Sequence, residues 1–180
     1  MASDPTWYTF MNSPFGDLLL ARNSAGLFCA SFQEGSNPKT PEAGWRLNPA
    51  ALAEAVFQLQ AYFDGELCQF SLSLAPQGLP FQRQVWRAAE MIPYGETVTS
   101  HELACRFLCQ PHLPLAVETA CRQNPLAILI PVHRVVGSHV APAGHPGGER
   151  FHQALLSLER QVRSRLNLQQ MFTEFQTNTL

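Results

Sequence analysis

The chain has 180 residues and a formal net charge of -2, with 46% hydrophobic and 14% charged residues. It is long enough to bury a core as one sizeable domain or as two small ones with a joint core. Its charge gives no global attraction to phosphate, so any nucleic-acid contact must come from a local basic patch. The N-terminus lacks a secretory signal and no apolar run could span a membrane, so we expect a cytoplasmic protein without a membrane partner.

The first third of the chain predicts a small antiparallel sheet followed by a helix. Turn residues separate three strand-like runs, with the runs at 8–11, 18–22 and 27–32 and the turns at 14–17 and 23–26. A surface loop rich in Pro and Gly is expected at 36–49, and apolar residues recur at helical spacing over 50–63. We expect residues 1–75 to form a structural unit that carries no chemistry.

The second half of the chain is expected to be mostly helical. Thr99 or Ser100 is placed to cap a helix over about 100–108, and Glu102 would complete a capping box if Thr99 is the cap. Pro114 suits the first position of a further helix that continues to about Gln123. Two helices joined by a short turn outline a helix-turn-helix, although this arrangement also occurs in proteins that never touch nucleic acid.

The most distinctive stretch covers residues 124–138, where an uninterrupted apolar run leads into Pro131, Val132, His133 and Arg134. The run has no polar alternation, so we expect it to be buried on both sides. Pro131 fixes its own φ and favours an extended residue before it, so the three residues that follow are presented at a defined point. Active-site residues are often held in this way, at a fixed point directly after a buried segment.

The cysteines form an odd set of five without a metal-type CxxC pair: Cys29, Cys68, Cys105, Cys109 and Cys121. In a cytosolic protein such a set indicates reduced thiols, most of them buried apolar residues. Cys105 and Cys109 could share a helix face with His101, but their spacing is also that of an ordinary helix core. We therefore predict neither a metal nor a cofactor.

From Phe81 to Glu159 the sequence resembles the O6-alkylguanine-DNA alkyltransferase family. The resemblance is carried by Asn-Pro, the apolar run, Ile-Pro-X-His-Arg-Val-Val-Gly-Ser, a Gly-Gly pair and the helix that reaches Glu159. It implies an α+β fold, in which a small N-terminal antiparallel sheet with a helix precedes a mostly helical, winged-helix-like domain with the helix-turn-helix. We expect this alkyltransferase-like domain over residues 76–165 and a C-terminal tail over 166–180.

In the family that this sequence resembles, X is a cysteine that accepts the alkyl group irreversibly, and the matched histidine and glutamate activate its thiolate through water. Here X is Val132, which has no thiol, so we expect no alkyl transfer at this position. The expected site is a degenerate one, in which Asn124, His133 and Glu159 form a buried network that supports the apolar run. Cys121 belongs to a helix, and nothing in the sequence places its thiol beside His133.

The resemblance also implies DNA contacts, at positions that depart from the family. Leu115 replaces an arginine that takes the place of the flipped guanine, and Ser100 replaces a tyrosine that rotates the target phosphate. Leucine can wedge between base steps but cannot hydrogen-bond the orphaned cytosine. Glu118 replaces a small residue and would repel phosphates. The DNA-binding residues that we expect are Ser100, Leu115, Arg122, Arg134 and Ser138.

The leading hypothesis is a catalytically inactive homologue, not an enzyme, that binds double-stranded DNA carrying O6-alkylguanine by base flipping and serves DNA repair without alkyl transfer. An alternative is a diverged homologue that no longer recognises lesions and binds a protein partner, because the family's arginine and tyrosine are missing. A third hypothesis is an active methyltransferase that uses another thiol. Several departures together favour natural divergence over an engineered change at Val132.

Overall fold

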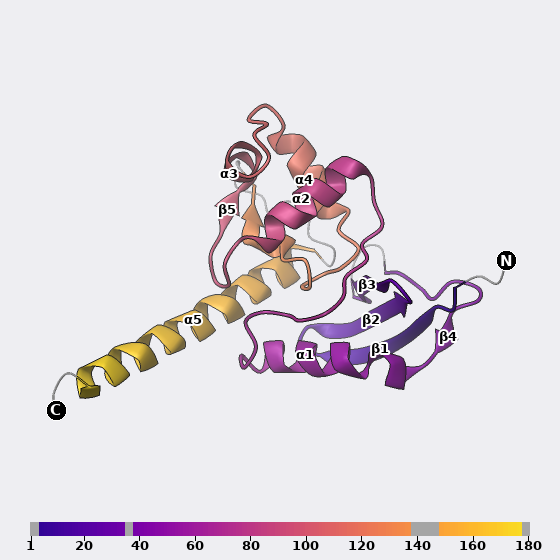
Figure 1. Ribbon diagram of the computed structural model, residues 1–180, viewed down its shortest axis with the longest axis horizontal. Helices are drawn as coiled ribbons and strands as arrows, with labels where there is room; N and C mark the ends of the chain where they lie inside the picture. Colours follow the sequence, from indigo (N-terminus) through magenta and orange to yellow (C-terminus); the bar gives the residue numbers. More distant parts are fainter. Residues whose placement is uncertain (1–3, 35–37, 138–147, 178–180) are drawn as a thin grey trace.

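The computed structural model describes residues 4–34, 38–137 and 148–177, with side chains as far as residue 170. A sheet lies at one end of the molecule, a group of helices stands on it, and one long C-terminal helix extends away from both (Figure 1). None of the helices in these described ranges is both long and apolar enough to cross a membrane. The predicted α+β fold is confirmed.

The N-terminal sheet has four strands in the order β3-β2-β1-β4. The strands are β1 (Trp7–Ser13), β2 (Gly16–Asn23), β3 (Gly26–Phe32) and β4 (Arg46–Leu47). The first three pair antiparallel as predicted, and β4 adds to β1 in parallel. On β2, Leu18 and Leu20 join the main core, while Leu19 packs on the other face against Trp45 and its neighbours. This alternation is that of a sheet covered on both faces.

The helix that follows the sheet begins with a tighter turn than expected. Its first turn is the 3₁₀ helix η1 (Pro49–Leu52), and α1 (Ala53–Phe63) continues it. Asn48 caps η1, because its side-chain oxygen accepts a hydrogen bond from the Ala51 N–H at 3.2 Å. Helix α1 runs along the sheet (Figure 1) and contributes Leu59 to the main core.

The helical part consists of short elements joined by tight connections. They are α2 (Pro80–Glu90), β5 (Val98–Thr99), α3 (Ser100–Arg106), α4 (Pro114–Arg122), the 3₁₀ turn η2 (Val132–Arg134) and β6 (Val135–Val136). The predicted capping box is confirmed, since Thr99 accepts from the Glu102 N–H while the Glu102 carboxylate accepts from the Thr99 N–H. The Trp86 indole N–H donates to the Ala120 carbonyl at 2.8 Å and ties α2 to α4.

The apolar run at 126–130 joins the helical part to the sheet. All five residues are buried, as expected. The Ala127 N–H donates to the Ala30 carbonyl of β3 at 2.9 Å, and the Ala30 N–H donates to the Pro125 carbonyl at 2.8 Å. The run does not continue as a strand, because Ile128 has a φ of 72°. The run therefore holds η2 in a fixed position relative to the sheet.

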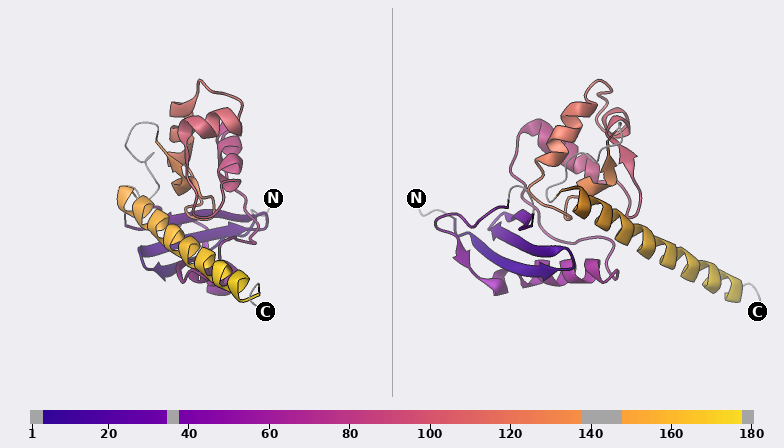
Figure 2. Two further views of the ribbon diagram at one scale, coloured as in Figure 1. Left: turned by 90° about the vertical axis from the view of Figure 1, so that its left-hand side faces the viewer. Right: turned by 180° about the vertical axis from the view of Figure 1, so that it is seen from behind.

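The C-terminal helix α5 spans Glu149–Thr177. We expected the helix that reaches Glu159 to continue beyond Arg160 and then to fray into a tail over 166–180, but it runs without interruption to Thr177. Its sequence contains neither proline nor glycine, so nothing local stops it. Its N-terminal half packs on the helical part and its C-terminal half projects away from the body (Figure 2).

Candidate functional site: the buried corner and the helix-turn-helix face

His133, Arg134 and Glu159 meet in a buried group, called the corner cluster below. The Glu159 carboxylate of α5 lies 2.8 Å from His133 Nε2, 2.9 Å from Arg134 Nε and 2.9 Å from Arg134 Nη2. Arg134 Nη1 donates to the Ile92 carbonyl at 2.7 Å. His133 and Glu159 are fully buried and Arg134 is 7% exposed. The contact predicted between His133 and Glu159 is present, and Arg134 is an additional partner.

Three residues that the sequence did not single out complete the corner cluster. The Tyr62 hydroxyl donates to Glu159 Oε1 at 2.8 Å, and the Gly95 N–H donates to Glu159 Oε2 at 2.9 Å. The Arg134 guanidinium lies over the Tyr94 ring, 5.5 Å from its centroid. Tyr62 lies far from Glu159 in the sequence and looks like an ordinary core position of a helix, so no local signal could have identified it.

Gly95 is needed at this place for two reasons. Its φ is 73°, a left-handed conformation that other residues rarely adopt. A Cβ there would lie 2.9 Å from Arg163 Cδ and 3.2 Å from the Glu159 carbonyl oxygen. The glycine thus lets the turn after α2 approach α5 closely enough for its N–H to reach the carboxylate.

Burial and ion pairing set the protonation states in the corner cluster. Burial alone would raise the pKa of Glu159, but its hydrogen bonds and charge interactions with His133 and Arg134 outweigh burial and lower the pKa to about 2. Burial lowers the pKa of His133, despite its hydrogen bond to Glu159. The Glu159 carboxylate is therefore paired with the Arg134 guanidinium, and burial disfavours the charged form of the His133 imidazole beside it.

Val132 and Asn124 take part in the packing around the corner cluster. Val132 is 3% exposed, belongs to the main core, and has no atom that can act as a nucleophile. Asn124 does not join His133 and Glu159 as expected. Its amide donates to the Leu126 and Ile130 carbonyls, each at 3.1 Å, and its oxygen accepts from the Leu126 N–H. The prediction that Asn124, His133 and Glu159 form one network is wrong, because the Asn124 side chain forms these hydrogen bonds with the backbone of the apolar run.

The residues expected to bind DNA are placed in very different environments. Leu115 on α4 is 75% exposed, and Arg122 at the end of α4 is exposed with its guanidinium donating to Thr119 Oγ1 at 3.0 Å. Ser100 is fully buried and its hydroxyl donates to the Glu118 carboxylate at 2.8 Å. Arg134, expected among the DNA-binding residues, is buried in the corner cluster, where it forms an internal ion pair with Glu159. Ser138 lies outside the described residues.

An apolar groove runs between the start of α2 and α4. It has a volume of about 410 Å³ and includes Leu79, Phe81, Leu115 and Ala116 in its lining. Leu79 is 68% exposed, so two large apolar side chains face solvent within one groove. We call this groove, together with Arg122 at the end of α4, the α4 face. It is apolar along the groove and cationic at Arg122.

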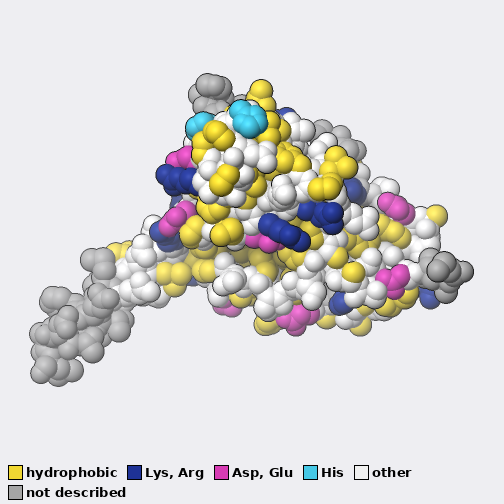
Figure 3. Space-filling model, turned by 45° about the horizontal axis from the view of Figure 1, so that its top comes forward, with side chains coloured by type: hydrophobic (Ala, Val, Ile, Leu, Met, Phe, Trp, Pro, Cys, Tyr) yellow, Lys and Arg dark blue, Asp and Glu magenta, His cyan; other side chains and the backbone are white. Residues whose placement is uncertain are grey.

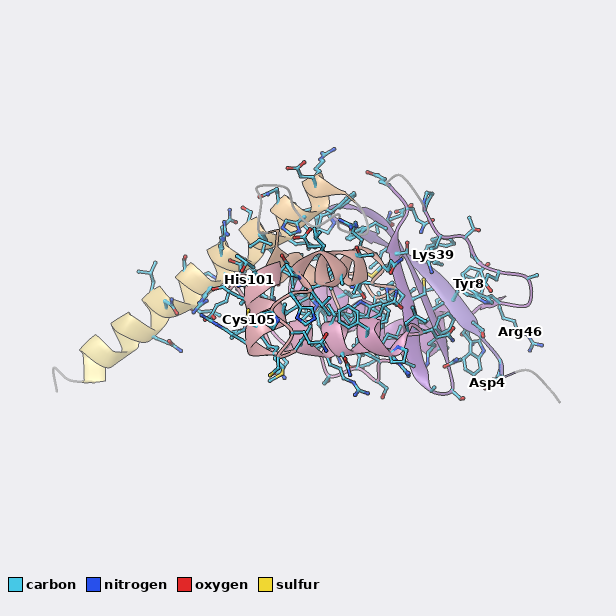
Figure 4. The ribbon with its side chains drawn as sticks, turned by 90° about the horizontal axis from the view of Figure 1, so that it is seen from above. Asp4, Tyr8, Lys39, Arg46, His101 and Cys105 are labelled. Carbon is cyan, nitrogen blue, oxygen red and sulfur yellow. The ribbon has the colours of Figure 1, made fainter. Side chains whose placement is uncertain are left out.

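The five cysteines differ in their readiness to react. Burial raises the pKa of Cys29 to about 11 and that of Cys121 to about 12, so neither thiol ionises readily. Cys105 on α3 is half-buried, and its sulfur lies 3.4 Å from His101 Nε2 (Figure 4). Among the described residues no group of three or more His, Cys, Asp or Glu side chains is arranged to hold a metal ion.

Comparisons with known proteins agree over nearly the whole chain. Residues 6–76 match the ribonuclease-like domain and residues 80–161 the DNA binding domain of 6-O-methylguanine DNA methyltransferase. A Methanosarcina barkeri protein named methylated-DNA–protein-cysteine methyltransferase is 42% identical over 85% of this chain and 96% of its own length. A protein of the same name from Mycolicibacterium paratuberculosis is also 42% identical, over 85% of this chain and 92% of its own.

Solved structures give the same result. The crystal structure of Mycobacterium tuberculosis O6-methylguanine methyltransferase superposes with a TM-score of 0.78 at 38% identity, covering 87% of this chain and 93% of that one. A crystal structure described as the Mycobacterium tuberculosis protein in complex with DNA gives a TM-score of 0.80 at 38% identity, covering 87% of this chain and 94% of that one.

These relatives contradict the hypothesis of a catalytically inactive homologue that is not an enzyme. Proteins about 40% identical to most of this chain are named as methyltransferases, so a pseudoenzyme is not the conclusion that the likeness supports. The hypothesis depended on Val132, which has no thiol, and on the judgement that the sequence places no other thiol, Cys121 included, beside His133. The identity and coverage place the chain in the 6-O-methylguanine DNA methyltransferase family, to which it belongs.

Proposed function

We propose that this chain repairs alkylated DNA, by binding duplex DNA on the α4 face and moving an alkyl group from a base to one of its own cysteines. The observation that carries the proposal is the likeness to the Mycobacterium tuberculosis protein in complex with DNA, over 87% of this chain. Relatives named methylated-DNA–protein-cysteine methyltransferases supply the reaction class.

The exposed residues of the α4 face suit a duplex in which a base is flipped. Leu115 is 75% exposed, so its side chain is free to wedge between base steps. Arg122 supplies a cation for a phosphate at the other end of the helix. The Glu118 carboxylate keeps its charge, and the buried Ser100 hydroxyl that donates to it holds it against α3. Base flipping itself is part of the proposal.

Because Val132 has no thiol, the proposed transfer requires a cysteine elsewhere in the chain as the acceptor of the alkyl group. Cys29 and Cys121 are buried with raised pKa values, which makes them poor acceptors. Cys105 has an imidazole within hydrogen-bond reach, the arrangement that activates a nucleophilic thiol, and it lies on the first helix of the helix-turn-helix. In the proposed step the sulfur–methyl bond forms as the O6–methyl bond breaks, and the thiol proton passes through His101 to the released guanine.

The proposal is tested with two short duplexes that differ only by one O6-methylguanine. Fluorescence anisotropy at low and moderate salt measures binding, and intact mass followed by peptide mapping measures transfer. We expect tighter binding to the methylated duplex and a gain of one methyl mass that Cys105→Ser abolishes and Cys109→Ser leaves in place. Transfer that maps to another cysteine would correct the acceptor alone, whereas an unchanged mass at saturating duplex would reject the transfer.

Two further expectations belong with this proposal. We place the protein in the cytoplasm, because an odd set of five cysteines suits a reducing compartment. The partner proposed is double-stranded DNA carrying O6-alkylguanine, and the protein partner considered from the sequence has no support among the relatives described above.

A further inference from the structure

A cleft separate from the α4 face opens between α2, the connecting segment at 68–76 and the apolar run with η2. Its volume is about 560 Å³, which is in the range of small-molecule sites of about 300–1,000 Å³. None of the described residues that line it belongs to α3 or α4. It lies where the sheet part and the helical part meet, and ligand sites often form at such junctions.

The rim of the cleft carries two cations on one helix. Arg83 and Arg87 lie one turn apart on α2, both are exposed, and side chains at this spacing are neighbours on a helix surface. Within the described part of the chain, neither forms an ion pair with a carboxylate at 4.0 Å or less. Among the described residues of the lining, Glu90 is the one carboxylate, and Arg134 is already neutralised by Glu159. The rim therefore has an excess of positive charge.

Part of the wall of the cleft is apolar, and this part is fixed in place. It includes Phe70, Leu72 and Trp86. The Trp86 ring is held by its hydrogen bond to the Ala120 carbonyl. The connecting segment is held to β3, because Leu27 N–H donates to the Ser73 carbonyl at 2.8 Å and Ala75 N–H donates to the Leu27 carbonyl at 2.6 Å. Figure 3 shows Lys and Arg side chains next to exposed hydrophobic surface on the face that it draws.

We propose that this cleft binds an organic phosphate with a flat apolar body, of the nucleoside monophosphate class. Arg83 and Arg87 hold the phosphate, because a pair of guanidinium groups matches its oxygens in geometry as well as in charge. The aromatic and aliphatic wall takes the base. Such a phosphate comes either from a free nucleotide or from the 5′ end of a nucleic-acid strand, and the two sources are separated in the test.

Cys68 offers a local reporter for the test, because it lines the cleft and is half-buried. The rate at which N-ethylmaleimide labels Cys68 is followed by peptide mass with adenosine 5′-monophosphate present or absent. We expect the nucleotide to slow the labelling of Cys68 several-fold while the exposed Cys109 reacts at an unchanged rate. Adenosine and inorganic phosphate, each at the same concentration, should protect much less, since each supplies only half of the interaction.

Variants separate the proposed site from a general charge effect. The double variant Arg83→Gln/Arg87→Gln should lose the protection of Cys68, whereas Arg106→Gln, an exposed arginine of α3, should keep it. Glu90→Gln should strengthen the protection, because it removes a negative charge from the lining. A misfolded variant would lose protection, so a gain cannot come from misfolding. A 5′-phosphorylated oligonucleotide that protects better than the free nucleotide would assign the site to a strand end.

The proposal would be overturned if the nucleotide left the labelling of Cys68 unchanged. It would also be overturned if adenosine protected as well as the nucleotide, or if the double variant were protected like the unchanged protein. This site is independent of the proposed alkyl transfer, so the cleft can be occupied whether or not a methyl group reaches a cysteine.

Discussion

The corner cluster and the α4 face differ in the burial of their side chains and in the number of bonds that hold them. In the corner cluster, His133, Arg134 and Glu159 are buried and each is bonded to the others or to the backbone. On the α4 face, Leu115 and Arg122 are exposed and few contacts hold them. Substitutions in the first region should therefore change stability, and substitutions in the second should change binding. The predictions below test this division, from the largest expected effect to the smallest.

Glu159→Ala should cause the largest loss of stability. It leaves the Arg134 guanidinium buried without its carboxylate and removes the acceptor for Tyr62 and Gly95. Removal of one partner of a buried ion pair costs about 3–5 kcal/mol of unfolding free energy. Urea unfolding measures this loss of unfolding free energy. The control is Glu96→Ala, which breaks the exposed pair with Arg163 and should cost about 0–1 kcal/mol. Equal losses for the two variants would contradict the division.

Acid should destabilise the protein in two steps. Burial lowers the pKa of His152 to about 4 and also lowers that of His133, so the unfolded chain takes up protons below about pH 6.5 that the folded chain does not. Stability is thus fully present above that pH and falls as the pH drops, by roughly 3 kcal/mol for His152 alone. Glu159, with its pKa of about 2, adds a further loss below about pH 4.5.

The measurement for this prediction is the urea midpoint as a function of pH. Substitution of His152 by glutamine should flatten the profile between about pH 6.5 and 4, because the titrating group is removed. The sign is decisive. A stability that rises as the pH falls through this interval would mean that one of the buried imidazoles is charged in the folded state.

Arg122→Ala should weaken binding to every duplex by a similar factor and leave the fold intact. The guanidinium is exposed, and among the described residues its hydrogen-bond partner is Thr119 on the same helix. Loss of a single phosphate contact should reduce the salt dependence of the binding constant by a slope of about 1. Arg46→Ala on β4 is the matched control, because that arginine is exposed and lies on the sheet part. An equal effect of both variants would place the DNA surface elsewhere.

Leu115→Ala should have the smallest effect, about 1 kcal/mol in binding. The side chain is 75% exposed, so its loss should change the unfolding free energy by no more than about 0.5 kcal/mol. The binding loss should be larger for a duplex with a methylated base than for an intact one, because a wedge acts where a base is displaced. Leu168→Ala on α5, also exposed, is the control. A loss that is the same for both duplexes would argue against a wedging role.

Local patterns in the sequence predicted the elements well, because short-range rules govern them. The three hairpin strands, the capping box of Thr99 and Glu102, the helix that begins at Pro114 and the burial of the run at 126–130 all follow from residues close together in the chain. The contact of His133 with Glu159 was also expected, although only through the resemblance to a known family. The DNA contacts proposed for Leu115 and Arg122 remain predictions.

The contacts that the sequence could not reveal join segments far apart in the chain. Arg134 looked like a surface cation until packing against α5 buried it with Glu159, and Ser100 looked exposed until α4 brought Glu118 to it. The cleft beside Arg83 needs three separate segments to exist at all. The sequence by itself determined which segments become strands and helices, since those choices depend on neighbours within a few residues. Only the tertiary structure decided which polar side chains are buried and paired, because that depends on partners that the fold brings together.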